Sequence, residues 1–166
     1  MHTLGINIGS SSIKVTLLDG DKIIWNNIEP HEGNFLHVLE KNLKSVKMPA
    51  DVRALATGTE GRYLLNVASV IEPLCIEEAL RHLQYKADAL VSLGGEDLVV
   101  YTLDENRKII TSFSGNKCAS GTGEFFKQQL ARMNMNLDDI GCIAGDCRVL
   151  KLSSRCSVFM KSDCTH

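Results

Sequence analysis

Residues 3–18 read TLGINIGSSSIKVTLL, and this stretch decides the fold class. Two apolar segments with alternating side chains, Thr3–Ile8 and Ile13–Leu18, flank a short run of glycine and serine, so they are predicted to be neighbouring antiparallel strands. A second turn leads into a third expected strand, Lys22–Ile28. The beginning of the chain therefore predicts an antiparallel β-meander whose first hairpin is closed by small hydroxyl residues.

A helix is expected directly after this meander. Asn34 is a suitable N-cap for a helix over Phe35–Val46, which would place Phe35, Val38, Leu39 and Leu43 on one face. Further along, the short apolar segments Val52–Thr57 and Ala68–Ile71 are expected to be strands. Helices are expected at Tyr63–Val67 and Glu77–Tyr85.

The same pattern then begins again. Strands are expected at Ala89–Leu93, Asp97–Leu103 and Lys108–Phe113, and helices at Glu124–Met133 and Leu137–Ile143. Two meanders of the same plan indicate a duplicated architecture, with a first lobe over residues 1–87 and the start of a second lobe over residues 88–166. Because nothing follows to complete a parallel sheet in the second unit, we expect the sequence to be a fragment of a longer chain.

Composition excludes several classes of function. The chain has 166 residues, a formal net charge of −2, 44% hydrophobic and 23% charged residues, which is ordinary for a globular domain. No block of Lys and Arg offers an electrostatic footprint for nucleic acid. No apolar run is long enough to span a bilayer and the first residues lack a signal-peptide pattern, so no membrane association and a cytoplasmic location are expected.

Two glycine-containing turns occupy equivalent places in the two meanders. Gly9–Ser12, followed by Lys14, can present backbone N–H groups, hydroxyls and a point charge to a phosphate. The stretch is not a Walker motif, and a plain hairpin turn is the ordinary alternative. Gly94–Asp97 is the counterpart in the second meander, and this pairing favours nucleotide binding over two unrelated turns.

Cysteine is concentrated in the last third of the chain. Cys118 precedes the predicted helix that begins near Glu124, and a helix N-terminus stabilises a nearby thiolate, which can bind iron or zinc. A buried structural thiol is the alternative for any single cysteine. The six cysteines are Cys75, Cys118, Cys142, Cys147, Cys156 and Cys164.

Cys156 lies in a second polar loop, Ser153–Ser157. Two thiolates do not complete a four-cysteine cluster, but a two-fold dimer would supply two from each subunit. A zinc site built from Cys142, Cys147, Cys164 and His166 is a less favoured alternative, because its spacings are irregular. The other histidines, His2, His31, His37 and His82, are expected on the surface or on helix faces.

Five motifs together resemble a known family. In order they are LGINIGSSSIKV, LATGTEGRYL, SLGGEDLVVY, GNKCASGTGEFF and SSRCSVFMKSDCTH, and they run through essentially the whole chain. They are similar to the BadF/BadG/BcrA/BcrD ATPases, the activators of 2-hydroxyacyl-CoA dehydratases and benzoyl-CoA reductases, within the superfamily of acetate kinase, hexokinase, heat-shock chaperones and actin. The resemblance implies an α/β, actin-like (ribonuclease H-like) ATPase fold whose second lobe is truncated here.

The resemblance also implies a function. Its members are homodimers that use ATP to pass a low-potential electron from a shared [4Fe–4S] cluster to a CoA-ester dehydratase or reductase. The implied cofactors are ATP or ADP with Mg²⁺ and the cluster, and by motif match Cys118 and Cys156 would be the cluster ligands. The residues implied to bind nucleotide are Gly9, Ser10, Ser11, Ser12, Lys14, Gly94, Gly95, Glu96, Gly121, Thr122 and Gly123.

Three departures from the family bear on catalysis. Asn7 and Ser92 stand where the family has carboxylates that would hold Mg²⁺, and Glu96 stands where it has Gln. We therefore expect weak or absent hydrolysis, with Asn7 and Glu96 as the only catalytic candidates. The adenosine-binding glycine motif is missing too, so the base should be held poorly. The alternative is a non-catalytic ATPase repeat that acts as a binding or assembly module; a sugar-kinase or acetate-kinase activity lacks a candidate substrate residue.

Overall fold

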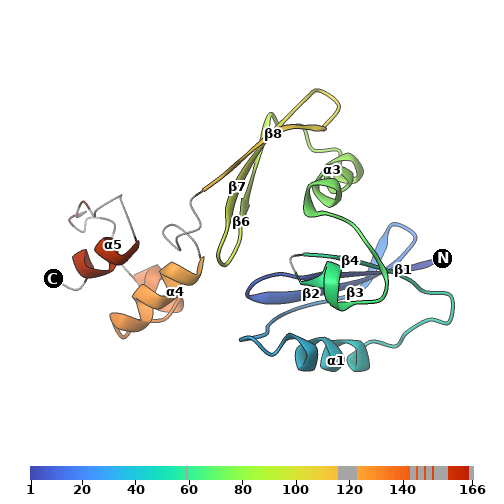
Figure 1. The fold of residues 1–166 in the computed structure, drawn as a ribbon, viewed down its shortest axis with the longest axis horizontal. Coiled ribbons are helices and arrows are strands. Elements are labelled where there is room, and N and C mark those ends of the chain that lie inside the picture. The colour runs from blue at the N-terminus through green and yellow to red at the C-terminus, as the bar shows by residue number, and fades with distance from the viewer. Residues whose placement is uncertain are drawn as a thin grey trace. The chain divides into compact units, whose positions relative to one another are not determined.

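The computed structural model of the chain describes residues 1–58, 60–115, 123–142, 145, 148, 151 and 157–164. The chain divides into two compact units. The first comprises Met1–Lys86 together with Asn106–Ile109, and the second comprises Ala87–Glu105 together with Ile110–His166. Each unit contains its own sheet, and Figure 1 labels most of the elements of both.

The first unit is built on a five-stranded sheet in the order β3-β2-β1-β4-β5. β1, β2 and β3 form the predicted antiparallel meander, while β4 and β5 run parallel to β1. The third strand continues to Pro30 instead of ending at Ile28, which the sheet tolerates because β3 is an edge strand. The bounds are β1 His2–Ile8, β2 Ser12–Asp19, β3 Lys22–Pro30, β4 Arg53–Thr57 and β5 Ala68–Ser69.

The core of this unit lies between the sheet and helix α1 (Phe35–Ser45), which follows one face of the sheet in Figure 1. Alternate residues of β1 and β2 point to that face in cross-strand pairs, and six of them are at most 4% exposed: Leu4, Ile6, Ile8, Ile13, Val15 and Leu17. The predicted apolar face of α1 packs against them through Val38 and Leu39. Each such side chain contributes about 1.5–3 kcal/mol when buried, so the alternation in residues 3–18 is the main source of stability for this unit.

The start of α1 differs from the prediction in one respect. The helix begins at Phe35 as expected, but the Asn34 side chain makes no capping hydrogen bond. Only the Asn34 carbonyl takes part, accepting the Val38 N–H at 3.3 Å. Asn34 has φ −99° and ψ 54° instead of the extended conformation in which a cap side chain reaches the helix N–H groups.

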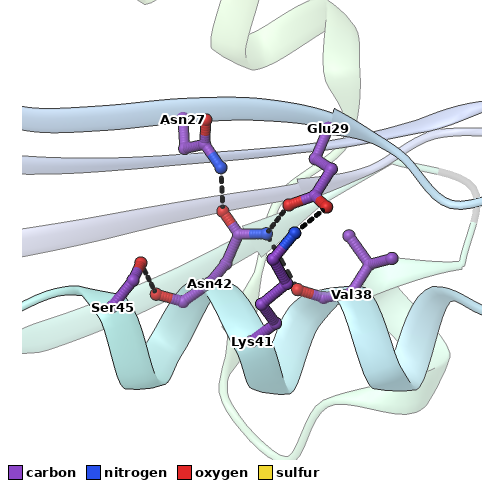
Figure 2. A network of polar contacts seen from close by, with 6 residues as sticks. All are labelled: Asn27, Glu29, Val38, Lys41, Asn42 and Ser45. Carbon is purple, nitrogen blue, oxygen red and sulfur yellow. Dashed lines mark hydrogen bonds and ion pairs between the residues drawn. The ribbon is translucent and has the colours of Figure 1, made fainter.

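A network of hydrogen bonds around the buried Asn42 connects α1 to the edge strand β3 (Figure 2). Asn42, only 2% exposed, accepts a hydrogen bond from Asn27 Nδ2 at 2.8 Å and donates to the Val38 carbonyl at 2.8 Å and to Glu29 Oε2 at 3.2 Å. The Lys41 ammonium bonds Glu29 as well and holds the pKa of that carboxyl below its ordinary value. Every polar atom of the Asn42 carboxamide is thus satisfied.

We expect Asn42→Ala to lower the free energy of unfolding by about 2–3 kcal/mol, because it leaves Asn27 and Glu29 without their buried partner and opens a cavity. The change is measured as a shift in the urea midpoint. Lys44→Ala, on the exposed side of the same helix where Lys44 pairs with Glu40 at 2.5 Å, is the control and should cost less than about 0.5 kcal/mol. Equal losses in the two variants would contradict a special role for the network.

Helix α3 (Glu72–Leu83) begins five residues before the predicted Glu77. Pro73 lies in its first turn, where the missing N–H and fixed φ of proline are tolerated. On this helix Glu77 accepts the Ile109 N–H at 2.9 Å and the Lys108 ammonium at 2.8 Å. These bonds explain why Asn106–Ile109 belongs to the first unit. The third α-helix described in the first unit, α2, spans Gly61–Leu64 in place of the predicted Tyr63–Val67.

The second unit contains a three-stranded sheet in the order β6-β7-β8, so the second predicted meander is present. Its strands are β6 Ala89–Leu93, β7 Leu98–Leu103 and β8 Ile109–Ser114. Helix α4 (Gly123–Arg132) buries Phe125 and Leu130, as its amphipathic pattern predicts. The expected helix at Leu137–Ile143 is a 3₁₀ helix, Asp138–Cys142, and α5 (Ser157–Asp163) was not predicted.

Candidate functional site

The two glycine turns singled out in the sequence have the same construction. In the first, the Gly9 N–H donates to the Ser12 carbonyl at 3.1 Å, next to the strand pair Ile8 and Ile13. In the second, the Gly94 N–H donates to the Asp97 carbonyl at 2.8 Å, next to the pair Leu93 and Leu98. The equivalence predicted from the repeated pattern is therefore present in the hydrogen bonds as well.

The first turn is rich in hydrogen-bond donors that are not used internally. Within the described residues, the N–H groups and hydroxyls of Ser10 and Ser11 donate to no other residue. Lys14 reaches back along β2, and its ammonium donates to Ser12 Oγ at 2.9 Å. The result is a concentration of N–H, O–H and positive charge at one hairpin end, which suits an anion with several acceptor oxygens.

A row of polar side chains crosses the sheet beside this turn. Asn7 pairs with Lys14 on β2 and with Thr57 on β4, so the three side chains share the face of the sheet opposite α1. They line a cavity of about 210 Å³ that also includes Thr16 and Cys75. Thr57 Oγ1 is buried there and bonds no residue in the described part of the chain. The row contains amide, hydroxyl and ammonium groups but no carboxylate.

Gly58 holds the end of β1 in place, a role that the sequence motifs did not assign. Its φ of +89° lies in the left-handed region, and a Cβ atom built on it would lie 2.3 Å from the Ile8 carbonyl oxygen and 2.6 Å from Asn7 Oδ1. The Ile8 carbonyl also accepts the Glu60 N–H at 3.3 Å. The signal available in the sequence was a glycine directly after the predicted strand Val52–Thr57, within the motif LATGTEGRYL.

His31 was also missed, and its expected place on the surface or a helix face was wrong. The residue is 7% exposed and follows β3 directly. Its ring Nε2 lies 3.0 Å from the Gly9 carbonyl oxygen, and its backbone N–H donates to the Ser11 carbonyl at 3.2 Å. It thus contacts the first glycine turn through both its ring and its backbone.

The second turn is bonded to the start of α4. The Gly123 N–H donates to the Gly94 carbonyl at 3.3 Å, and the Glu124 N–H donates to the Gly95 carbonyl at 2.8 Å. The structure therefore brings Gly94, Gly95 and Gly123 together. These two N–H groups of the helix are already used, so any anion at this end would have to be bound by other donors. Glu96 is exposed at the tip of the turn.

The remaining predicted site residues, Gly121, Thr122, Cys118 and Cys156, lie outside the described residues. In the ranges that the structure does describe, no group of three or more His, Cys, Asp and Glu side chains could hold a metal ion. Two cysteines in those ranges, Cys75 and Cys164, are free thiols. Among the same residues, no helix has the length and apolar character needed to cross a bilayer.

Comparisons with known proteins give a consistent set of relatives, although no family model matches the chain. It is 32% identical over 166 residues to an uncharacterised protein of Methanocaldococcus jannaschii, covering 96% of this chain and 67% of that protein. It is 27% identical to the 2-hydroxyisocaproyl-CoA dehydratase activator of Clostridioides difficile, covering 98% of this chain and 64% of the activator.

A solved structure agrees with these relatives. The activator of the 2-hydroxyisocaproyl-CoA dehydratase from Clostridium difficile, solved with bound ADPNP, superposes with a TM-score of 0.83 at 24% identity over 98% of this chain and 64% of that one. The chain thus spans about two thirds of the length of the relatives it matches, between 64% and 67%.

Proposed function

The chain belongs to the BadF/BadG/BcrA/BcrD family of dehydratase activators and has its actin-like ATPase fold, and from this premise we propose its function. We propose that it is the nucleotide-binding part of an ATP-dependent activator that passes a low-potential electron from a [4Fe–4S] cluster to a CoA-ester dehydratase or reductase. The observation that carries the proposal is the pair of identically closed glycine turns, the first of which has unused N–H and O–H donors.

In this proposal the first turn binds phosphate. The N–H groups and hydroxyls of Ser10 and Ser11 donate to phosphate oxygens, and Lys14, one residue past Ile13 on β2, supplies positive charge. Gly9 lets the backbone approach closely. In the second unit Gly94, Gly95 and Glu96 lie in the corresponding turn, and Gly121 and Thr122 directly precede Gly123, the first residue of α4, in the sequence.

Mg²⁺ would have a modest site in this chain. The Asn7 carboxamide oxygen and the Thr57 hydroxyl, which bonds no other described residue, are uncharged oxygen ligands. They can bind a hydrated Mg²⁺ ion that keeps most of its waters. With Asn7 and Ser92 in place of carboxylates, Glu96 is the candidate for accepting a proton from an attacking water. We therefore propose slow hydrolysis, with Asn7 and Glu96 as the candidate catalytic residues.

The donor chemistry for the cluster fits as well. Thiolates are the usual ligands of iron–sulfur clusters, and Cys118 and Cys156 supply two from each chain. A homodimer related by two-fold symmetry would supply four. The bound cluster supplies a low-potential electron, and the partner that receives it is, in this proposal, the dehydratase or reductase that acts on a CoA ester. The named relative of Clostridioides difficile, an activator of such a dehydratase, supports this partner.

The first test is nucleotide binding by the chain purified without oxygen. We expect ADP and ATP to bind, with Mg²⁺-dependent phosphate release that is slow, and AMP to bind more weakly because it lacks the outer phosphates. Lys14→Met should weaken ADP binding by roughly 10- to 100-fold, the value of one charge-assisted hydrogen bond. Lys22→Met, an exposed lysine of β3, is the matched control and should leave the affinity unchanged.

Each outcome of that titration has a definite meaning. If neither ATP nor ADP binds with or without Mg²⁺, the proposed nucleotide site is wrong. If both bind but no phosphate is released, the chain acts as a binding or assembly module and the hydrolytic part of the proposal fails. If Lys14→Met binds ADP as the parent chain does, the first turn is not the phosphate site.

A further inference from the structure

We propose that His31 is a positioning residue for the phosphate-binding turn, an inference that rests on the proposed function of that turn. Nothing in the family motifs assigns it a role, and it lies between the motifs LGINIGSSSIKV and LATGTEGRYL. It is one of the few buried polar side chains in the described residues, at 7% exposure, and it contacts Gly9 and Ser11 directly. His31 fixes the direction in which the turn presents its N–H groups.

The ring of His31 is held on three sides. Nε2 lies 3.0 Å from the Gly9 carbonyl oxygen, and the Gly33 N–H lies 3.1 Å from Nδ1. A carbonyl only accepts and an N–H only donates, so Nε2 carries the proton and Nδ1 accepts. The ring edge packs against Phe35, with 6.0 Å between centroids and 85° between planes. A ring fixed in this way can hold the Gly9 carbonyl in one orientation.

The backbone of His31 holds a second carbonyl of the same turn. Its N–H donates to the Ser11 carbonyl at 3.2 Å, so the carbonyls of both Gly9 and Ser11 are directed to His31. A trans peptide places each carbonyl and the next N–H on opposite sides of the peptide bond. The N–H groups of Ser10 and Ser12 therefore point away from His31. The N–H groups of Ser10 and Ser12 thus point in a common direction, in which both can donate to one anion.

The hydrogen bonds of the turn support this role. Gly9 donates its N–H to the Ser12 carbonyl, but among the described residues the return bond from the Ser12 N–H to the Gly9 carbonyl is not made. The histidine ring takes that carbonyl instead. In a simple two-residue hairpin both bonds would form and would use the Ser12 N–H. By taking the Gly9 carbonyl, His31 leaves this N–H available.

A purely structural role is the competing explanation. The same residue also organises the segment after β3, where Nδ1 accepts the Gly33 N–H and the His31 carbonyl accepts the Asn34 N–H at 2.6 Å. The two roles use different ring nitrogens. Nε2 serves the phosphate-binding turn, whereas Nδ1 serves the connection to α1.

Two substitutions test the roles of the two ring nitrogens separately. In His31→Gln the side-chain amide NH₂ lies about where Nε2 does and can donate to the Gly9 carbonyl, whereas in His31→Asn the amide oxygen lies near Nδ1 and can accept only from Gly33. The experiment measures binding of inorganic tripolyphosphate and of ADP to the full chain by calorimetry, with urea midpoints for every variant. His37→Asn, an exposed histidine of α1, is the matched control.

We expect His31→Asn to weaken tripolyphosphate binding about tenfold, the equivalent of one hydrogen bond, and His31→Gln to recover the affinity to within about threefold. His37→Asn should bind like the parent chain. The inference is overturned if His31→Asn keeps the parent affinity, or if a folded His31→Gln loses as much affinity as His31→Asn. A parent chain that binds neither ligand overturns the proposed function and this inference with it; if Lys14→Met alone weakens binding, only the role of His31 is wrong.

Discussion

Replacing Gly58 with alanine is expected to lower the free energy of unfolding by about 3 kcal/mol. The added Cβ would lie 2.3 Å from the Ile8 carbonyl oxygen and 2.7 Å from the Ile8 carbonyl carbon, and both are backbone atoms that rotation of a side chain does not remove. Ile8 is fully buried in the core of the first unit, so β1 has little freedom to move away. The φ of +89° adds strain that an L-residue must also bear.

The control for this prediction is Gly33→Ala. Gly33 has nearly the same backbone conformation, with φ +85°, but a Cβ built there would meet nothing within 4 Å. Its replacement should cost about 1 kcal/mol, the conformational strain alone. The difference between the two urea midpoints isolates the collision with β1. Equal losses would show that Gly58 is required for its φ and not for the close approach to Ile8.

The same substitution should also affect ligand binding. Asn7 Oδ1 lies 2.6 Å from the added Cβ, so Asn7 must move out of the polar row that it forms with Lys14 and Thr57. Folded Gly58→Ala protein should therefore bind ADP more weakly than the parent chain does. Gly58 links the parallel strand β4 to the proposed phosphate site at the end of β1.

Local sequence patterns were sufficient for the main elements of the fold. The alternation of Thr3–Ile8 and Ile13–Leu18 predicted both strands and their buried face, because a period of two leaves only one way to bury the apolar side chains. The apolar face of α1 was predicted in the same way. The fit to solved activators then confirmed the actin-like fold that the ordered motifs had suggested.

The errors arose where structure depends on distant residues. The burial of His31 depends on its contact with Gly9, which lies 22 residues earlier in the chain. No local pattern around Pro30 and Gly33 indicates this contact. The steric role of Gly58 depends on Ile8 in the same way. The early start of α3 was also missed, because the helix was predicted only over the amphipathic segment Glu77–Tyr85, whereas proline is well accommodated in a first helical turn.

The candidate site was predicted unevenly for the same reason. Sequence spacing placed the two glycine turns in equivalent hairpins, since each follows an apolar strand and precedes another. It did not reveal that Gly94 and Gly95 would accept the N–H groups of Gly123 and Glu124. That arrangement depends on contacts between the turn and the start of α4, 29 residues later in the chain. Residue types indicated which groups can bind phosphate, but not which of them are already used.

Loss of the proposed cluster is the largest functional effect that we expect. Anaerobically reconstituted chain should contain about four irons and four acid-labile sulfides per dimer, and Cys118→Ala or Cys156→Ala should each reduce both to background. Two-fold symmetry makes a single substitution severe, because it removes one ligand from each subunit and so two of the four thiolates. The visible absorption of the cluster should disappear together with the iron.

Two other cysteines provide the controls, because they distinguish a specific site from a general need for thiols. Cys75 and Cys164 are free thiols in the described part of the chain; Cys75 lies outside the five motifs, and Cys164 follows Cys156 by eight residues in the last of them. Cys75→Ala and Cys164→Ala should therefore keep the full iron and sulfide content. If Cys164→Ala instead loses its metal while Cys118→Ala retains it, and the metal is zinc, the ligands are the cysteines and histidine at the end of the chain. That result would remove the electron-transfer part of the proposal and leave nucleotide binding to stand alone.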